Sequence, residues 1–118
     1  MNRGKIVLVP FPFDDLSTSK VRPAICLTEP AGPHRHVVLA FITSKDPDEL
    51  LDSDATLSDQ HPNFSTTGLR ISSILRLHRL LTVTTSLIQR ELGKLPDTLQ
   101  SEVDEKLRTL FGLKNVNT

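Results

Sequence analysis

Three short apolar runs rich in β-branched residues follow one another in the first 43 residues, and proline or glycine separates them. They are "KIVLVPF" at 5–11, "RPAICLT" at 22–28 and "HVVLAFIT" at 36–43. Runs of this length and composition predict buried β-strands. Pro10 and Pro12 lack an N–H donor, so they fit an edge, a bulge or a strand end. The polar stretch "DDLSTSK" that follows them favours a mobile surface loop.

The turn residues between the second and third runs, Pro30, Gly32 and Pro33, predict that these two strands pair. Further along, "RISSILRL" at 70–77 and "LLTVT" at 80–84 predict two more strands, tightly connected through His78 and Arg79. A short exposed strand is expected around "DATLS" at 54–58. The first two thirds of the chain therefore favour an antiparallel sheet.

The C-terminal third changes to a helical period. Thr84 or Thr85 can cap a short helix "SLIQREL", which Gly93 would end. A second helix is predicted from near Asp97, because apolar residues then recur at steps of four, four and three. These residues are Leu99, Val103, Leu107 and Leu110. Strands first and helices last predict a mainly β fold with α: a small, strongly bent antiparallel sheet or barrel with C-terminal helices, in one domain spanning 1–118.

Charge is balanced over the chain but not along it. Fourteen basic and fourteen acidic residues cancel, so a nucleic-acid partner would have to meet a local patch. Residues 46–59 carry six acidic residues and no Lys or Arg, whereas residues 61–90 carry four arginines and no acid. The sequence is thus polarised into an acidic segment and a basic one.

Several classes of protein lack support in the sequence. No apolar stretch approaches the roughly 20 residues of a membrane helix, and the N-terminus lacks a secretory apolar core, so a cytosolic protein is expected. Cys26 is the only cysteine, which excludes an internal disulfide and a thiolate zinc cluster and favours a buried role. The chain contains no phosphate-binding glycine loop, HExxH, nucleophile elbow or CxxC motif.

Arg22 lies where the polar loop returns to a strand. Pro23 restricts Arg22 to extended backbone angles, which would hold its side chain at the strand end. A guanidinium is always charged and grips a phosphate through two parallel N–H bonds, so a fixed arginine here suits a phosphodiester transition state. The alternative is an ordinary ion pair with Asp14, Asp15 or a later acid.

Hydroxyl and imidazole groups supply the other candidates. Thr43 and Ser44 follow a strand, where they can donate to a ligand oxygen or make ordinary turn bonds. His34 and His36 share a face if extended, but no third ligand accompanies them, so no metal site is predicted. His78 suits a surface turn or, beside Arg76 and Arg79, an RNA contact.

These residues together carry a resemblance. The opening "GKIVLVPFPFDDLSTSKVRPAICL", followed by "AFITS", "GL" at 68–69, "SSILRLHRLLTV" and "LIQRELGKLP", resembles the PemK/MazF-type toxins of bacterial toxin–antitoxin modules over nearly the whole chain. The resemblance implies an SH3-like barrel with terminal helices and a homodimer silenced by a small antitoxin. It also implies cleavage of single-stranded RNA without metal or other cofactor.

The resemblance also implies roles for particular residues. Arg22 matches the catalytic arginine of the family and Thr43 its catalytic threonine. In such enzymes the ribose 2′-OH attacks the phosphate, which gives a 2′,3′-cyclic phosphate and a 5′-OH. Many relatives carry an acidic or His residue just before the Arg-Pro pair, where this chain has "STSK" and Lys20 is the nearest titratable group. His78 and Arg79 stand where relatives often have Asp-Gln.

Further residues are candidates for contacting RNA. They are Phe13, which stacks on a base or packs in the core, together with Lys20, Ser44, Arg76, His78 and Arg79. Two rival functions stay open, because the same fold hosts toxins that poison DNA gyrase without cutting RNA, and because an inactive regulatory module would not need the missing loop acid. The pair of Arg22-Pro23 and Thr43 favours the ribonuclease.

Overall fold

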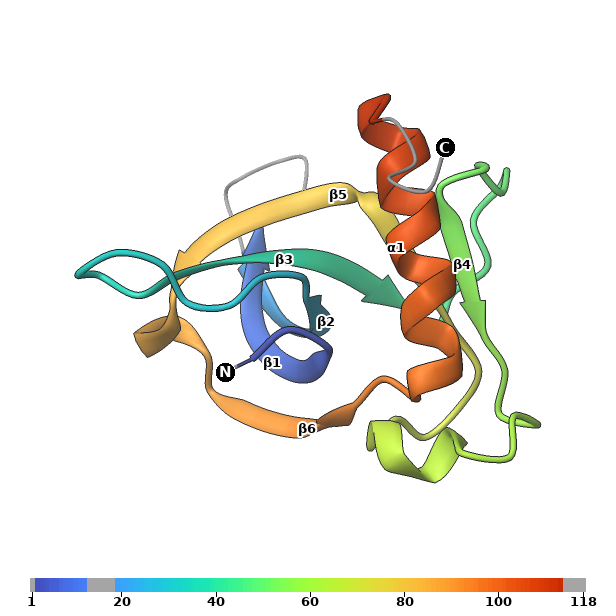
Figure 1. The fold of residues 1–118 in the computed structure, drawn as a ribbon. Coiled ribbons are helices and arrows are strands. Elements are labelled where there is room, and N and C mark those ends of the chain that lie inside the picture. The colour runs from blue at the N-terminus through green and yellow to red at the C-terminus, as the bar shows by residue number, and fades with distance from the viewer. Residues whose placement is uncertain (1, 13–18, 114–118) are drawn as a thin grey trace.

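The computed structural model describes residues 2–12 and 19–113 (Figure 1). Within them the strands are β1 (Lys5–Pro12), β2 (Ser19–Cys26), β3 (His36–Thr43), β4 (Asp54–Leu57), β5 (Ser73–Thr84) and β6 (Arg90–Lys94). Two 3₁₀ turns, η1 (Phe64–Thr67) and η2 (Thr85–Leu87), and one helix, α1 (Asp97–Phe111), complete the described part. Phe13, a predicted base-stacking residue, lies outside the described residues, as does most of the loop before Arg22.

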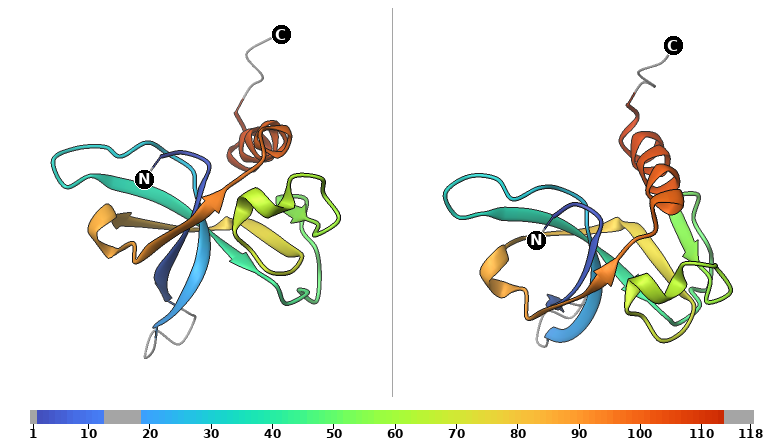
Figure 2. Two further views of the ribbon diagram at one scale, coloured as in Figure 1. Left: turned by 90° about the horizontal axis from the view of Figure 1, so that it is seen from below. Right: turned by 60° about the horizontal axis from the view of Figure 1, so that its bottom comes forward.

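The strands form one antiparallel sheet in the order β4-β5-β3-β2-β1-β6. The sheet curls into a half-barrel, and α1 packs beside β4 and β5 (Figure 2). The predicted mainly β fold with a small bent antiparallel sheet is therefore confirmed, as is the pairing of the second and third apolar runs. Pro10 and Pro12 lie beyond Leu8, the last β1 residue that pairs with β6, so their missing N–H groups face an unpaired edge.

The prediction of a short helix "SLIQREL" before Gly93 is wrong. Thr84 does cap a turn, since its Oγ1 accepts from the Ser86 N–H, but the turn is the three-residue η2 and not a helix. Residues 90–94 form β6 instead, and the Gln89 N–H donates to the carbonyl of Leu8 at 2.8 Å. A seven-residue helix nucleates poorly, whereas the free edge of β1 offers ready backbone partners.

The prediction of two separate strands at 70–77 and 80–84 is also wrong. Ser73–Thr84 form one strand, β5, and His78 and Arg79 lie within it. On β3, Ala40 pairs with Leu80 and the next residue pairs with Arg76, so three residues of β5 bulge out between them. One eight-residue strand, β3, pairs with both halves of β5, which favours a bulge over a reversal of the chain.

The expected strand around "DATLS" exists as β4, but it is not exposed. Asp54, Ala55 and Leu57 are buried, because β4 pairs with β5 along one edge and α1 covers it. The predicted helix from Asp97 is confirmed as α1, and Val103 is its buried residue. Leu99 and Leu107 pack half-buried against the same core, whereas Leu110 is exposed.

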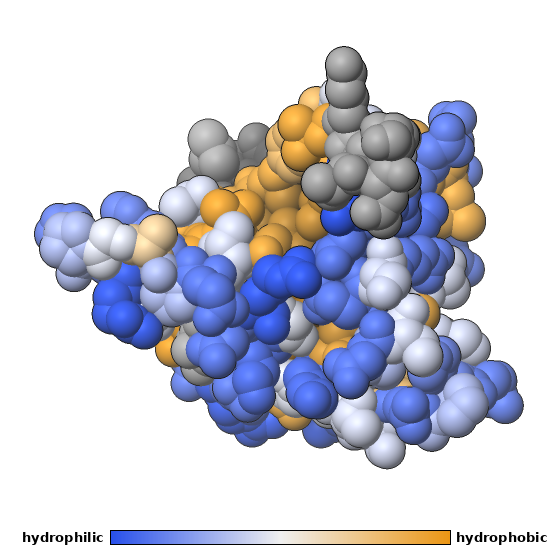
Figure 3. Space-filling model, in the orientation of Figure 1, coloured by the Kyte–Doolittle hydropathy of each residue, from blue (hydrophilic) through white to orange (hydrophobic). Residues whose placement is uncertain are grey.

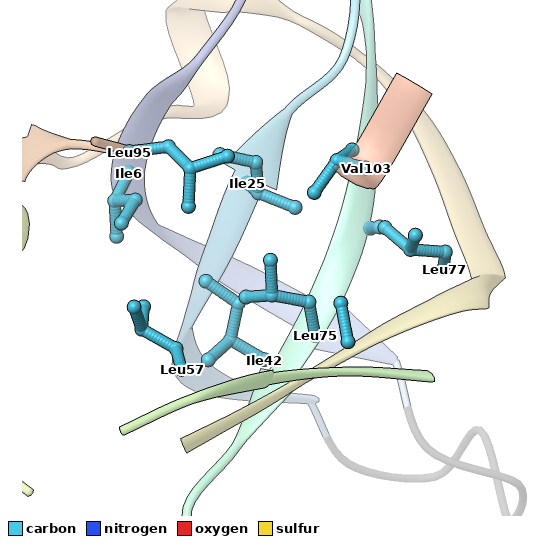
Figure 4. Close-up of a cluster of buried hydrophobic side chains, with 10 residues drawn as sticks. Ile6, Ile25, Ile42, Leu57, Leu75, Leu77, Leu95 and Val103 are labelled. Atoms are coloured by element: carbon cyan, nitrogen blue, oxygen red, sulfur yellow. The ribbon is translucent and has the colours of Figure 1, made fainter. Parts of the chain in front are cut away.

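Two apolar clusters fill the half-barrel. One lies under α1 (Figure 4), and its members are Ile6, Ile25, Ala40, Ile42, Ala55, Leu57, Leu75, Leu77, Leu95 and Val103. The other comprises Val7, Val9, Phe11, Ala24, Cys26, Val37, Leu39, Phe41 and Val83. Cys26 is fully buried as predicted, and burial raises the pKa of its thiol. On the outer surface, apolar side chains gather over β5 and the upper end of α1 (Figure 3).

Gly93 does not end a helix, but β6 requires it for another reason. A Cβ at this position would overlap the carbonyl oxygen of Thr66 and the backbone of Thr67 in η1. We therefore expect Gly93→Ala to lower the free energy of unfolding by about 3 kcal/mol or more, the upper end of overpacking costs, because the overlap is with backbone atoms; urea denaturation measures this. Gly32→Ala is the control, since a Cβ there meets nothing within 4 Å and costs only about 1–2 kcal/mol for its positive φ of 76°. Equal losses in the two variants would contradict the packing argument.

Candidate active site

The site begins where β2 and β3 stop pairing. Ala24 pairs with Phe41, Ile25 with Ala40 and Cys26 with Leu39, and the ladder ends there. Pro23 has no N–H to continue it. The same register carried two residues further would set Arg22 opposite Thr43. Pairing stops before these two residues, and both line the gap that follows.

That gap is a cavity of about 780 Å³, which we call the phosphate cavity only for the kind of anion that its cationic lining suits. Its lining comes from the end of β2, the end of β3 with the loop after it, and the segment before β5. The lining residues are Arg22, Pro23, Phe41, Ile42, Thr43, Ser44, Lys45, Leu69, Arg70, Ile71 and Ser73. Three of them are cations and none is acidic, so the cavity favours an anion.

Arg22 and Thr43 are both half-buried in this wall. Nη1 of Arg22 donates to the carbonyl of Val21 at 3.3 Å, which helps to fix the direction of the guanidinium. The Thr43 Oγ1 accepts from the Lys45 N–H at 3.1 Å. A hydroxyl that already accepts from the backbone keeps its own hydrogen for a ligand oxygen. Ser44 is exposed at the rim, so its hydroxyl also reaches the cavity.

A second cavity of about 230 Å³ adjoins the first, with which it shares Phe41, Thr43 and Lys45. We call it the side cavity. Its other lining residues are Asp46, Pro47, Asp48, Arg76 and Arg79. The guanidinium of Arg79 lies over the Phe41 ring, 5.1 Å from its centroid, within the range of a cation–π contact. Two arginines predicted to contact RNA, Arg76 and Arg79, therefore line a cavity together with Thr43.

The buried carboxylate of Asp54 contacts Arg76, one of the residues that line the side cavity. The Asp54 side chain is fully buried, its Oδ2 accepts from the Leu51 N–H at 2.8 Å, and its Oδ1 lies 2.9 Å from Nε of Arg76. The Nε–H is not aligned on Oδ1 as a hydrogen bond, so this contact is an electrostatic pair. A buried carboxylate needs a compensating cation, and Asp54 therefore holds Arg76 in place.

His78 lies at the edge of this group, with its Nδ1 4.0 Å from Asp54 Oδ1. Burial lowers the pKa of His78, and the nearby Arg76 and Arg79 lower it further against the opposing pull of Asp54. His78 is not among the lining residues of either cavity, and neither is Lys20. Lys20 does share a face of β2 with Arg22, two residues away.

The remaining candidates lie elsewhere. His34 and His36 have ring centroids 5.9 Å apart, but His36 begins β3 and Thr43 ends it, so they lie at the end of β3 away from the cavities. Within the described residues, no three side chains of the His, Cys, Asp and Glu types gather as they would around a metal ion. Over the same residues, no helix has the length and apolarity to cross a membrane.

Sequence reasoning missed Lys45, Arg70 and Asp54. Lys45 directly follows the predicted Thr43-Ser44 pair, and Arg70 belongs to the basic segment, so both had a weak signal. Asp54 had only the acidic segment as its signal. The pairing of β4 with β5, which sets Asp54 opposite Arg76, converts those two charge segments into one contact.

Comparison with known proteins decides the family. Residues 2–111 match the family model described as PemK-like, MazF-like toxin of type II toxin–antitoxin system. The chain belongs to this family. The resemblance found in the sequence is thereby confirmed, and the protein is a toxin of a type II toxin–antitoxin system. A search of curated protein sequences found no match.

Solved structures of MazF toxins share the fold. MazF from Deinococcus radiodurans is 19% identical with a TM-score of 0.72, over 96% of this chain and 97% of that one. An endoribonuclease in complex with its cognate antitoxin from Mycobacterial species is 12% identical with a TM-score of 0.70, over 98% of both chains. The Mycobacterium tuberculosis toxin MazF-mt6 is 19% identical with a TM-score of 0.65, over 92% of this chain and 99% of that one.

The Asp54–Arg76 pair of this PemK-like, MazF-like toxin gives a stability prediction. Arg76→Met should lower the free energy of unfolding by about 3–5 kcal/mol, because it leaves the buried Asp54 charge uncompensated. Adding Asp54→Asn should restore part of the loss, since it removes that charge and keeps an oxygen for the Leu51 N–H. Urea denaturation of the two single variants and the double variant measures the coupling.

An exposed pair provides the control. Arg108→Met breaks the contact with Glu105 on α1, which is 3.0 Å long and solvent-exposed, and should cost less than about 1 kcal/mol. A double variant at Asp54 and Arg76 that is less stable than Arg76→Met alone would contradict the electrostatic account.

His78 gives a pH prediction. Its pKa in the folded protein is below the ordinary value of 6.5, so below about pH 6.5 the unfolded chain binds a proton that the folded chain resists. The contribution of His78 to stability should therefore fall as the pH drops through 6.5, and should level off below the folded pKa. Urea denaturation from pH 7.5 to 5.0 should show a shallower loss for His78→Gln. An identical pH dependence in the variant and the wild type would refute this.

Proposed function

We propose that this toxin is a metal-independent endoribonuclease that cuts single-stranded RNA at selected sequences. The observation that carries the proposal is the meeting of Arg22 and Thr43 across one cavity whose charged lining residues, Arg22, Lys45 and Arg70, are all cations. Such a cavity suits a phosphodiester, and its two walls offer a guanidinium and a hydroxyl to opposite sides of it. A homologous fold described as an endoribonuclease supports the assignment.

The reaction uses the RNA itself as the nucleophile. The ribose 2′-oxygen attacks phosphorus, the bond to O5′ breaks, the 2′-hydroxyl gives up its proton, and O5′ gains one. The products are a 2′,3′-cyclic phosphate and a 5′-OH. Arg22 neutralises the pentacoordinate phosphorane and supplies a hydrogen bond or a proton to its oxygens, while Thr43 donates a hydrogen bond that fixes the phosphate. DNA lacks the 2′-OH and is left intact.

The other predicted residues act as RNA contacts. Ser44 lies on the rim of the phosphate cavity, and Arg76 and Arg79 line the side cavity next to it. Lys20 and His78 lie outside both linings and would meet the RNA beyond them. Base stacking by Phe13 stays a prediction from the sequence.

The toxin would also bind protein partners. We infer a homodimer and a cognate antitoxin, as a homologous structure has been described with its antitoxin. Apolar side chains exposed at the end of α1 give such partners a surface to cover (Figure 3). They are Leu110, Phe111 and Leu113. A toxin that cuts mRNA and is silenced by an antitoxin would act in the cytoplasm.

Cleavage of a labelled RNA tests the catalytic pair. The wild-type toxin should cut RNA in the presence of EDTA, and Arg22→Ala and Thr43→Ala should each slow cleavage by about 100- to 1,000-fold, because each removes one donor to the transition state. Thr43→Ser keeps the hydroxyl and should retain most of the activity. Arg90→Ala, an exposed arginine on β6, is the control for loss of positive charge.

The same assay separates the rival functions. A wild-type toxin that leaves RNA intact but stalls DNA gyrase would overturn the ribonuclease in favour of a gyrase poison. A wild-type toxin that does neither would favour an inactive regulatory module.

A further inference from the structure

We propose that the side cavity is a base-selecting subsite that takes guanine, with Asp46 or Asp48 accepting from N1–H and N2–H₂ on its Watson–Crick edge and Arg76 with Arg79 donating to O6 and N7 on its Hoogsteen edge. The inference rests on the proposed ribonuclease function, since it places the base next to the cleaved phosphate. The two cavities share Thr43 and Lys45, so a nucleotide whose phosphate lies between Arg22 and Thr43 has its neighbouring base within reach of the side cavity.

The two cavities are lined by different sets of charged residues. The phosphate cavity holds cations only, whereas the side cavity sets Lys45, Arg76 and Arg79 against the carboxylates of Asp46 and Asp48. Carboxylates repel a second phosphate but accept N–H groups. The side cavity therefore suits a neutral group with donors on one edge and acceptors on the other.

Guanine has this pattern. Its N1–H and N2–H₂ groups are adjacent donors that one carboxylate can accept together, and its O6 and N7 are adjacent acceptors that an arginine fork contacts bidentately. Adenine, cytosine and uracil do not present two adjacent donor groups on one edge. The volume of about 230 Å³ is below the roughly 300–1,000 Å³ of pockets for drug-sized ligands, which agrees with a single base.

The arginines of the side cavity are held in place before any ligand binds. Asp54 Oδ1 lies 2.9 Å from Nε of Arg76, so the buried carboxylate holds that guanidinium in the lining of the side cavity. The Arg79 guanidinium lies over the Phe41 ring. Planar guanidinium groups held in this way provide a stacking surface as well as donors, and little side-chain entropy is lost on binding.

Binding to a DNA analogue of the substrate, which cannot be cut because it lacks the 2′-OH, tests the inference apart from catalysis. The probe is a pool of short oligonucleotides with 2′-deoxyribose at every position and all four bases in the central positions, whose bound members are sequenced. We expect guanine to be enriched at one fixed position. At that position, hypoxanthine, which lacks the N2 amino group, and 7-deazaguanine, which lacks N7, should each weaken binding by roughly 10-fold or more.

Variants of the carboxylates give the second arm. Asp46→Asn or Asp48→Asn should reduce the preference for guanine over hypoxanthine by roughly 10-fold and leave the affinity for the other bases nearly unchanged, because only the donor edge loses its partner. Asp59→Asn is the matched control, an exposed carboxylate outside both cavities that contacts Gln60. Asp46 and Asp48 are exposed loop residues, so both variants should fold as the wild type does.

The outcomes are distinguishable from failure of the proposed function. Enrichment of guanine with no cleavage of ribose RNA would support the subsite and overturn the ribonuclease. Cleavage of RNA with no preference for guanine beside the cut would overturn the subsite and leave the ribonuclease standing. Loss of guanine preference in Asp59→Asn, or its retention in both cavity variants, would also overturn the assignment to Asp46 and Asp48.

Discussion

The site depends on the point at which β2 and β3 stop pairing. Their ladder is continuous up to Ala24 and Phe41, and Pro23 ends it by lacking an N–H. Had the ladder continued, Arg22 and Thr43 would be neighbouring residues on one flat sheet, and no cavity would separate them. One missing backbone donor therefore ends the ladder where the cavity begins, while the pairing just behind it keeps β2 and β3 in register.

The second constraint is electrostatic. Burying Asp54 is costly unless a cation lies beside it, and the pairing of β4 with β5 brings Arg76 to that position. The bulge at residues 77–79 then changes which residues of β5 face the side cavity, and Arg79 comes over Phe41. The Phe41 ring also packs against Phe11 in the core, with the two ring centroids 5.0 Å apart. The wall shared by the two cavities therefore contacts Arg79 on the surface and Phe11 in the core.

Local signals predicted much of this structure. Short apolar runs predicted β1, β2 and β3, and the helical spacing of apolar residues predicted α1. The Arg22-Pro23 and Thr43-Ser44 pairs, chosen from the sequence, both line the phosphate cavity. The failures were tertiary. Residues 86–92 carry a weak helical pattern, but residues 90–94 pair with the open edge of β1 as a strand. His78 and Arg79 were predicted to connect two strands, because nothing local shows that β3 pairs with both halves of β5. Lys45, Arg70 and Asp54 needed the register of the sheet, which sequence pattern alone does not fix.

The two cavities also differ in how freely they can change. Arg22 and Arg76 are tied to the fold, one by the end of a ladder and the other by a buried carboxylate. Asp46 and Asp48 are exposed in a loop, where most substitutions change stability by less than about 0.5 kcal/mol. Under the proposed function, a chain built in this way can exchange the residues that would select a base without disturbing those that would hold a phosphate. Selectivity among related toxins would then vary in the loop after β3, while the chemistry at the β2–β3 junction stays the same.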